Sequence, residues 1–161
     1  VGATSPEALA KEVIARRADI GIALDGDGDR LVMVDHEGAV VDGDELLYMM
    51  AADQVRRGHS VEGIVGTLMS NLGLEQAIRE MGLDFHRANV GDRYVMQALE
   101  ARGWSLGGEG SGHLICLDKT STGDAIVAAL AVLSAMPGTG QQLSALKQGF
   151  RKYPQNMVNV S

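Results

Sequence analysis

Short apolar runs alternate along most of this chain with longer stretches whose apolar residues recur at helical spacing. In the stretch 71–81, for example, Leu74, Ala77 and Ile78 share one helical face, and Gly82 ends the pattern. Strands that alternate with helices of this length indicate an α/β fold with a mostly parallel sheet. In such folds, ligands bind at the carboxyl ends of the strands.

A hairpin-like N-terminal region precedes these units. The expected strands are 19–24, 31–34, 39–41, 64–66, 83–88, 104–106, 114–117 and 157–160, and the expected helices are 5–17, 46–57, 71–81, 93–101, 124–135 and 143–150. Gly43 is the best domain boundary, because the hairpin pattern gives way there to strand–helix units. The segment 137–140 is the best linker, since Pro137 is expected to stop the preceding helix.

The most informative local feature is an acidic loop, Asp25-Gly26-Asp27-Gly28-Asp29-Arg30, which follows the apolar run 20–24. Like charges at about 4 Å repel by roughly 1 kcal/mol per pair even in water. Three carboxylates at the end of a buried strand therefore predict a hard cation such as Mg²⁺, held by Asp25, Asp27 and Asp29. Arg30 could bind the other oxygens of a metal-bound phosphate, or neutralise its acidic neighbours.

Three other interpretations compete with a magnesium loop. A calcium-binding EF-hand is rejected, because it needs Gly at its sixth position and Glu at its twelfth, where this chain has Arg30 and His36. A phosphatase of the haloacid-dehalogenase type would use Asp25 as its nucleophile, although its fifth position is usually Thr or Val and here is Asp29. The third is a solvated turn, since Asp and Gly are common in turns.

A second loop, Gly107-Gly108-Glu109-Gly110-Ser111-Gly112-His113, presents a carboxylate, a hydroxyl and an imidazole on a glycine-rich backbone. These three groups suit the vicinal hydroxyls of a sugar. Ser111 and His113 alone do not establish a nucleophile and its base, because that assignment needs geometry and an oxyanion site. The alternative is a plain glycine-rich turn with a surface histidine.

Two further polar segments follow predicted strands. In Val90-Gly91-Asp92-Arg93-Tyr94, Asp92 is a natural N-cap for the next helix. In the segment 118–124, Thr122 or Asp124 is expected to cap the helix that follows. Capping is the simpler explanation for both segments.

Composition excludes several classes of function. The chain has 161 residues, a net charge of −7 and 4% aromatic residues, without a basic patch, which argues against a nucleic-acid partner. No apolar stretch approaches the ~20 residues of a membrane helix. Cys116 is the lone cysteine, and its apolar surroundings favour a buried, inert thiol in a reducing cytoplasm. Without an initiator Met or a signal-peptide pattern, the chain is expected to be a piece of something longer.

Together these motifs resemble the α-D-phosphohexomutase superfamily, and its phosphoglucosamine branch in particular. Asp25–Arg30 matches in full the superfamily's metal-binding loop, D-G-D-G-D-R, and Gly108–His113 matches in full its sugar-recognition loop, G-E-x-S-G-H. The segments 66–71, 90–95 and 118–124 are also similar to the phosphoglucosamine branch. The phosphomannomutase/phosphoglucomutase branch usually has His where Asp92 stands.

The resemblance implies a fold and a domain arrangement. The fold would be a three-layer α/β/α domain with a mixed sheet, plus a partial preceding domain. Residues 1–41 would be the end of domain 2 with the metal loop, and 42–136 would be domain 3 with the sugar loop. Residues 137–161 would be a linker and the first strand of domain 4.

The resemblance also implies an intramolecular phosphotransferase (an isomerase). It would interconvert glucosamine 6-phosphate and glucosamine 1-phosphate through a phosphoserine and a 1,6-bisphosphate, towards cell-wall precursors. The implied site residues are Asp25, Asp27 and Asp29 for Mg²⁺, Arg30 for the transferring phosphate, and Glu109, Ser111 and His113 for the sugar. The superfamily's catalytic serine lies in a T-A-S-H-N-P-like loop that no serine here matches, and its phosphate-binding R-x-S-G-T loop is absent too. This chain alone is therefore expected to be inactive.

Alternatives of three kinds stay open on the sequence alone. One is a phosphomannomutase or phosphoglucomutase relative, which differs only in the hexose. The second is a self-sufficient phosphatase that uses Asp25, and the third is a non-catalytic module that binds a sugar or a metal. The expected partners are a phosphosugar and the missing domains of the same enzyme, and the oligomeric state is open between a monomer and a homodimer.

Overall fold

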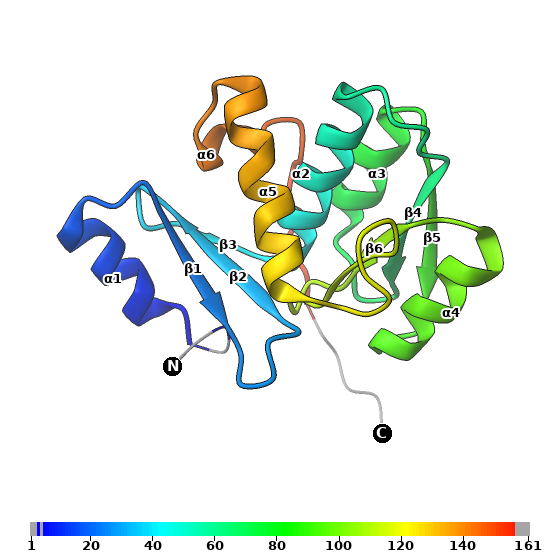
Figure 1. Ribbon diagram of the computed structural model, residues 1–161, viewed down its shortest axis with the longest axis horizontal. Coiled ribbons are helices and arrows are strands. Elements are labelled where there is room, and N and C mark those ends of the chain that lie inside the picture. The colour runs from blue at the N-terminus through cyan, green and yellow to red at the C-terminus, as the bar shows by residue number, and fades with distance from the viewer. Residues whose placement is uncertain (1–2, 4, 157–161) are drawn as a thin grey trace.

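A computed structural model describes residues 3 and 5–156 of the chain (Figure 1). The helices are α1 (Glu7–Arg16), α2 (Gly43–Arg56), α3 (Leu72–Glu80), α4 (Asp92–Arg102), α5 (Ala125–Thr139) and α6 (Leu143–Leu146). The strands are β1 (Ile20–Leu24), β2 (Leu31–Asp35), β3 (Val40–Val41), β4 (Gly63–Thr67), β5 (Asp84–Ala88), β6 (Leu106–Gly108) and β7 (Leu114–Cys116). The strand expected at 157–160 lies outside the described residues.

The strands form two sheets. β1, β2 and β3 make an antiparallel sheet in that order, and the second sheet has the order β5-β4-β6-β7. In the second sheet, β4 is parallel to β5 and β6, whereas β7 is antiparallel to β6. The short glycine-rich loop between β6 and β7 can only join antiparallel neighbours. The α/β class and the mixed sheet are thus confirmed, and the parallel part is β5-β4-β6.

Alternate residues of the second sheet enter two separate cores, which makes the domain three-layered. Ile64 and Leu106 pack in the larger core with α2, α3 and α5. Val65 and Ile115 point the other way and pack against α4 through Val95. Each fully buried Leu, Ile or Val contributes roughly 1.5–3 kcal/mol of burial free energy.

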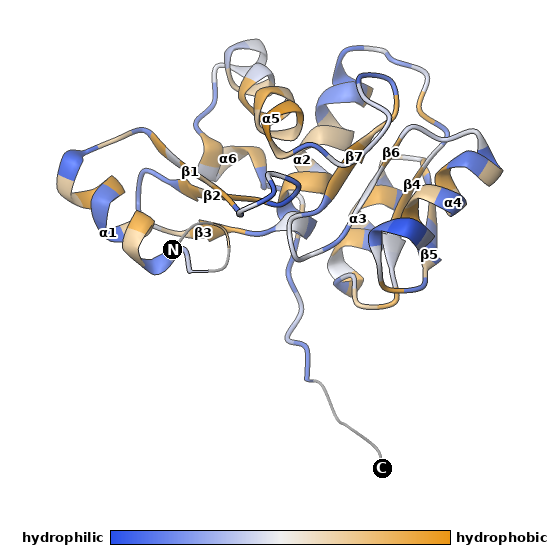
Figure 2. Cartoon of the chain, turned by 60° about the horizontal axis from the view of Figure 1, so that its bottom comes forward, coloured by the Kyte–Doolittle hydropathy of each residue, from blue (hydrophilic) through white to orange (hydrophobic). Residues whose placement is uncertain are grey.

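The antiparallel sheet joins the larger core rather than standing apart. Leu31 and Met33 of β2 are completely buried in that core, and α5 lies between the two sheets (Figure 1). α1 covers the other face, where Gly21 leaves room for Val13. In Figure 2 the strands β4 and β7 carry apolar residues, whereas α1 and α4 carry polar stretches. The loops after β1 and β6 are therefore parts of one packed body.

Polar side chains cap the starts of three helices, and the cap of α5 is one of the two residues predicted for it. Asp42 caps α2 in a capping box with Glu45, Asn71 caps α3, and Asp124 caps α5. The prediction for Asp92 was wrong. Gly91 is the cap of α4, with a φ of 126° that favours glycine. Within the part of the chain that the structure describes, the Asp92 carboxylate accepts only from the adjacent N–H of Arg93.

The expected helix end before Pro137 was also wrong, because α5 continues through Pro137 to Thr139. A proline near the end of a helix removes one hydrogen bond without stopping the last turn. That turn is held by the Thr139 hydroxyl, which contacts the carbonyl oxygens of Ala135 and Met136. Gly140, with a φ of 66°, then ends the helix.

Candidate functional site

The acidic loop between β1 and β2 folds around one of its own carboxylates. Oδ1 of Asp25 accepts the backbone N–H groups of Asp29 (3.2 Å) and Arg30 (3.1 Å), and Gly28 allows the turn with a φ of 74°. One carboxylate oxygen from each of Asp25, Asp27 and Asp29 lies within 4.8 Å of the others. The structure thus brings together the three acids that were predicted as metal ligands.

The donor set of this loop fits a hard divalent cation. Asp27 is exposed, while Oδ1 of Asp29 is buried without a hydrogen-bond partner among the described residues. Burial raises the pKa of Asp25, but the N–H groups of Arg30 and Asp29 outweigh it, so that the pKa lies below its usual range. Three converging carboxylates with an unpartnered buried oxygen are the arrangement that Mg²⁺ would complete.

The glycine-rich loop between β6 and β7 is packed much more closely. It turns through a hydrogen bond from the Gly112 N–H to the Glu109 carbonyl (3.0 Å), and the Gly43 N–H of α2 donates to Gly110 (3.1 Å). A Cβ on Gly43 would lie 2.0 Å from the Glu109 carbonyl oxygen. The glycines therefore serve a close backbone approach between this loop and the first turn of α2.

The two loops meet. The Leu31 N–H donates to the Gly112 carbonyl (2.9 Å), and Arg30 and His113 form an isolated antiparallel bridge. Nδ1 of His113 is hydrogen bonded to Oδ2 of Asp29 (3.2 Å). His113 is only 5% exposed, so the alternative of a plain turn with a surface histidine is wrong. His113 thus contacts a predicted metal ligand through one of its ring nitrogens.

A cleft of about 310 Å³ lies between the loops. It is lined by Asp29, Arg30, Val90, Gly91, Asp92, Glu109, Ser111 and His113. Oε1 of Glu109 accepts the Gly91 N–H (2.8 Å), while Ser111 is exposed. Asp25 and Asp27 belong to the adjoining acidic loop but do not line this cleft. The arrangement can offer a cation, a guanidinium and several hydroxyl-binding groups to one small polar ligand.

The third wall of the cleft, formed by Val90, Gly91 and Asp92 after β5, was not among the predicted site residues. Asp92 had been assigned to helix capping, and its side chain instead lines the cleft. The available signal was position, since this segment follows the carboxyl end of a strand neighbouring β4.

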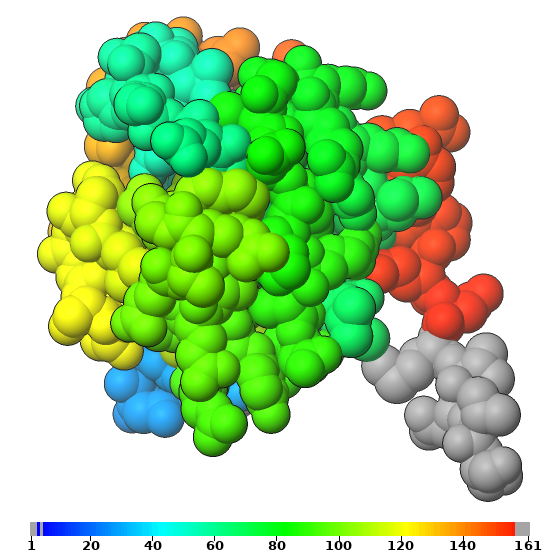
Figure 3. All heavy atoms as spheres, turned by 90° about the vertical axis from the view of Figure 1, so that its right-hand side faces the viewer, coloured from blue at the N-terminus to red at the C-terminus, as the bar shows by residue number. Residues whose placement is uncertain are grey.

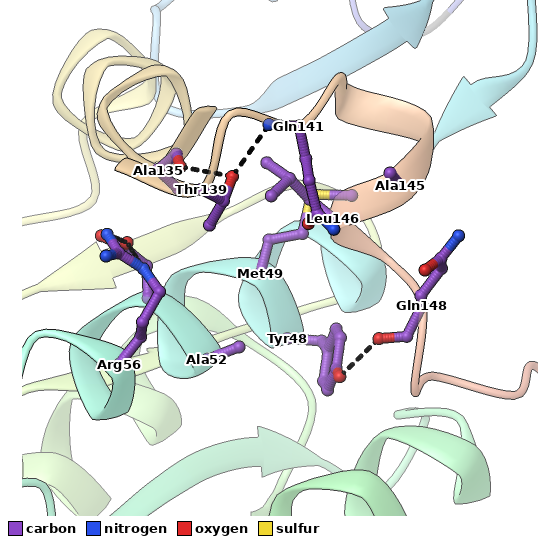
Figure 4. A pocket seen from close by; sticks show the side chains of 11 residues that line it. Tyr48, Met49, Ala52, Arg56, Ala135, Thr139, Gln141, Ala145, Leu146 and Gln148 are labelled. Carbon is purple, nitrogen blue, oxygen red and sulfur yellow. Dashed lines mark hydrogen bonds and ion pairs between the residues drawn. The ribbon is translucent and has the colours of Figure 1, made fainter. Parts of the chain in front are cut away.

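Other features lie outside the site. A second cavity, of about 240 Å³, lies between α2, α5 and α6 (Figure 4) and is lined by none of the predicted site residues. Cys116 is buried, as predicted, and burial raises the pKa of its thiol to about 12, which keeps it protonated. Among the described helices, none has both the length and the apolarity needed to cross a membrane.

Known proteins resemble the chain over nearly its full length. The curated phosphoglucosamine mutase of Methylococcus capsulatus is 62% identical over 160 residues, which are 99% of this chain and 36% of that enzyme. The chain thus spans about a third of the length of the curated relatives that it matches. Among solved structures, a phosphoglucomutase/phosphomannomutase family protein from Burkholderia thailandensis has a TM-score of 0.80 at 28% identity, over 94% of this chain and 33% of that one.

A more distant structure shares the fold. The Aspergillus fumigatus N-acetylphosphoglucosamine mutase, solved in complex with GlcNAc-6P and magnesium, has a TM-score of 0.69 at 19% identity, over 90% of this chain and 40% of that one. The family model for phosphoglucomutase/phosphomannomutase, alpha/beta/alpha domain III, matches residues 42–153. With both loop motifs in place beside that match, the chain belongs to the phosphoglucomutase/phosphomannomutase family.

Proposed function

We propose that this chain is the central part of a phosphoglucosamine mutase, an enzyme that interconverts glucosamine 6-phosphate and glucosamine 1-phosphate. The observation that carries the proposal is the meeting of the acidic loop and the glycine-rich loop at one cleft, through the contact of Asp29 with His113. The similarity to phosphoglucosamine mutases supports the amino-sugar substrate. The same proposal places the enzyme in the cytoplasm, where the thiol of Cys116 stays reduced.

Asp25, Asp27 and Asp29 would hold Mg²⁺ in this proposal. The bound ion would supply charge stabilisation for a transferring phosphoryl group. Magnesium and a phosphosugar in the distant A. fumigatus relative support this assignment. Arg30, whose Nε lies 3.9 Å from Oδ2 of Asp25, is half-exposed at the cleft and would bind phosphate oxygens bidentately.

The sugar would be bound from the glycine-rich loop. Glu109 keeps Oε2 available after Oε1 has accepted the Gly91 N–H, and the exposed Ser111 hydroxyl lies nearby on the same loop. His113 would act mainly by holding Asp29, at the boundary between sugar and metal. Water-accessible hydroxyl-binding groups of this kind suit a substrate that binds in two orientations.

The domain assignment belongs to the same proposal. Residues 1–41 would end domain 2, 42–136 would form domain 3, and 137–161 would lead into domain 4. The match of residues 42–153 to a domain III model supports the first boundary, while α5 carries helix past the second, to Thr139. The phosphoserine and the second phosphate-binding loop would come from the missing domains. The isolated chain should therefore have no mutase activity.

A phosphatase that uses Asp25 is the less favoured alternative. A nucleophilic carboxylate needs a free oxygen directed at phosphorus. In this structure Oδ1 of Asp25 is occupied by two backbone N–H groups, and its side chain is only 12% exposed. The geometry supports a ligand role for Asp25 over a nucleophilic one.

The test measures binding of glucosamine 6-phosphate to the isotope-labelled chain. NMR detects the binding, with and without Mg²⁺. We expect weak binding that shifts the signals of Glu109 and Ser111 and strengthens when Mg²⁺ is added. Asp27→Asn should abolish the strengthening, because Asp27 is an exposed member of the proposed ligand set whose side chain makes no hydrogen bond among the described residues. Asp19→Asn, another exposed aspartate, is the matched control.

Two outcomes would contradict the proposal. One is sugar-phosphate binding that is indifferent to both Mg²⁺ and Asp27→Asn. The other is phosphate-ester hydrolysis by the chain alone that Asp25→Asn abolishes, which would favour the phosphatase. A magnesium site tighter than about 1 μM, worth roughly 8 kcal/mol, would contradict the expectation that the site is completed by missing domains.

A further inference from the structure

Asp44, in the first turn of α2, is a buried carboxylate that the proposed function does not use. It is 4% exposed, and its Oδ2 accepts the Asn71 N–H (2.8 Å). Its Oδ1 is buried without a partner among the described residues. Burial raises the pKa of Asp44 to about 6. A buried carboxylate with one oxygen unpartnered is costly to the fold. The elements packed around Asp44 indicate which parts of the structure it holds in place.

The sugar loop lies directly against this carboxylate. A Cβ built on Gly110 would be 3.5 Å from Oδ2 of Asp44, which places the turn between Glu109 and Gly112 over the acid. The neighbouring Gly43 also donates its N–H to the Gly110 carbonyl. A displacement of Asp44 would therefore also displace the loop that carries Glu109 and Ser111.

On its other side, Asp44 reaches the segment 149–156, which we call the strap. Asn71 is fully buried, and while its N–H is bound by Asp44, its side chain binds the strap. The amide Nδ2 donates to the Tyr153 carbonyl (2.8 Å) and to Oε1 of Gln155 (3.1 Å), and Oδ1 accepts the Tyr153 N–H (2.9 Å). Asn71 is thus bonded both to Asp44 and to the strap.

Further contacts press the strap onto the N-terminal ends of α2 and α3. Lys152 forms an ion pair with Asp42, the cap of α2. Gly73 of α3 has no room for a Cβ, which would lie 1.8 Å from the Arg151 carbonyl oxygen. Just before the strap, the Tyr48 hydroxyl donates to the Gln148 carbonyl (2.9 Å; Figure 4). Figure 3 shows the strap in red along the edge of the green strand–helix region.

We propose that Asp44 and Asn71 are positioning residues that couple the sugar loop to the strap. In this coupling, a sugar phosphate held by the loop strengthens the hold of Asn71 on the strap; this part rests on the proposed function. By thermodynamic linkage, releasing the strap must weaken sugar binding by the same factor. The path is short, since the loop lies on Asp44, Asp44 binds the Asn71 backbone, and the Asn71 side chain binds Tyr153.

The first experiment needs no ligand. Asn71→Asp keeps the Oδ1 acceptor that caps α3 but replaces both Nδ2 donors to the strap with an oxygen. We expect trypsin to cleave after Arg151 and Lys152 about tenfold faster, because cleavage follows the population of the released strap. Coupling predicts that the backbone NMR signals of Gly110 and Ser111 shift in the same variant, and that Asp44→Asn changes both readouts. Asp19→Asn is the control and should change neither.

The second experiment adds glucosamine 6-phosphate with Mg²⁺. Bound sugar should slow strap cleavage in the unaltered chain and have little effect on cleavage in Asp44→Asn, even where the signals of Ser111 show that the sugar still binds. Sugar binding without slower cleavage would overturn the coupling. If Asn71→Asp speeds cleavage of the strap but leaves the NMR signals of Gly110 and Ser111 unchanged, the coupling is overturned as well. If no sugar binds, the proposed function fails, and the ligand-free experiment still decides the coupling.

Discussion

The acidic loop and the sugar loop carry similar polar side chains but are supported in opposite ways. The acidic loop folds around its own Asp25, and its glycines, Gly26 and Gly28, have open space around them. The sugar loop is pressed against other elements, and Gly43 and Gly112 mark contacts too close for any side chain. The first loop is free to adapt to a cation, whereas the second is preorganised by the fold.

The carboxylates beneath the two loops differ in the same sense. Backbone N–H groups lower the pKa of Asp25 despite its burial, so its negative charge is already stabilised. Burial raises the pKa of Asp44, under the sugar loop, to about 6. The fold thus stabilises the charged form of Asp25 in the acidic loop. It destabilises the charged form of Asp44 beneath the sugar loop.

The largest expected effect is a difference in unfolding free energy between two glycine-to-alanine changes, one in each loop. Gly112→Ala has a φ of 99° and a Cβ 2.2 Å from the Leu31 carbonyl oxygen, so strain and overlap together should cost about 3 to 5 kcal/mol of unfolding free energy. Gly28→Ala has a φ of 74° but open space, and strain alone should cost about 1 to 2 kcal/mol. Urea denaturation measures both. Equal losses would show that the two loops are supported alike.

Much of the fold was predictable because its signals are local. Helical spacing placed α3, the predicted cap at Asp124 placed the start of α5, and the acidic motif predicted a cluster that the structure shows to be close in space. The wrong predictions concern local structure that depends on residues far away in the sequence. Packing carries α5 through Pro137, and the approach of Gly91 to Glu109 depends on how two strands lie in one sheet.

The next effect is a loss of stability with rising pH, which comes from the sugar-loop side. With a pKa near 6 in the folded state and about 3.9 when unfolded, Asp44 binds its proton more tightly in the folded chain. Its contribution should therefore lower the unfolding free energy as pH rises from about 4 to about 6, by at most about 3 kcal/mol. The nearby charges act both ways, since Asp42 raises this pKa and Lys152 and Arg87 lower it.

Asp44→Asn removes the titrating group and should remove this decline in unfolding free energy across that pH range. Chemical denaturation at several pH values, without added metal, compares the variant with the unaltered chain. Asp25 contributes with the opposite sign, since its stabilisation is lost as pH falls. A variant curve parallel to the original would mean that Asp44 is not the group responsible.

A smaller effect tests the contact between the loops. His113 holds Asp29 through Nδ1, and partners of metal-ligating side chains commonly contribute about tenfold or more to metal affinity. His113→Ala should therefore weaken Mg²⁺ binding about tenfold, measured by calorimetry under conditions where the variant is folded. Ser111→Ala, in the same loop but without a contact to the acids, should leave Mg²⁺ affinity unchanged. Equal effects of the two variants would remove His113 from the metal site.

The smallest expected effect distinguishes support from recognition within the sugar loop. Glu109→Ala removes the acceptor of the Gly91 N–H and should cost about 1 kcal/mol of unfolding free energy, with a changed NMR signal for Gly91. Glu109→Gln keeps an acceptor oxygen and should restore both. If sugar binding uses the second carboxylate oxygen, Glu109→Gln will still bind the sugar phosphate more weakly than the unaltered chain, because an amide is a poorer acceptor than a carboxylate. Full recovery of sugar affinity in Glu109→Gln would instead mean that Glu109 only holds the cleft wall in place.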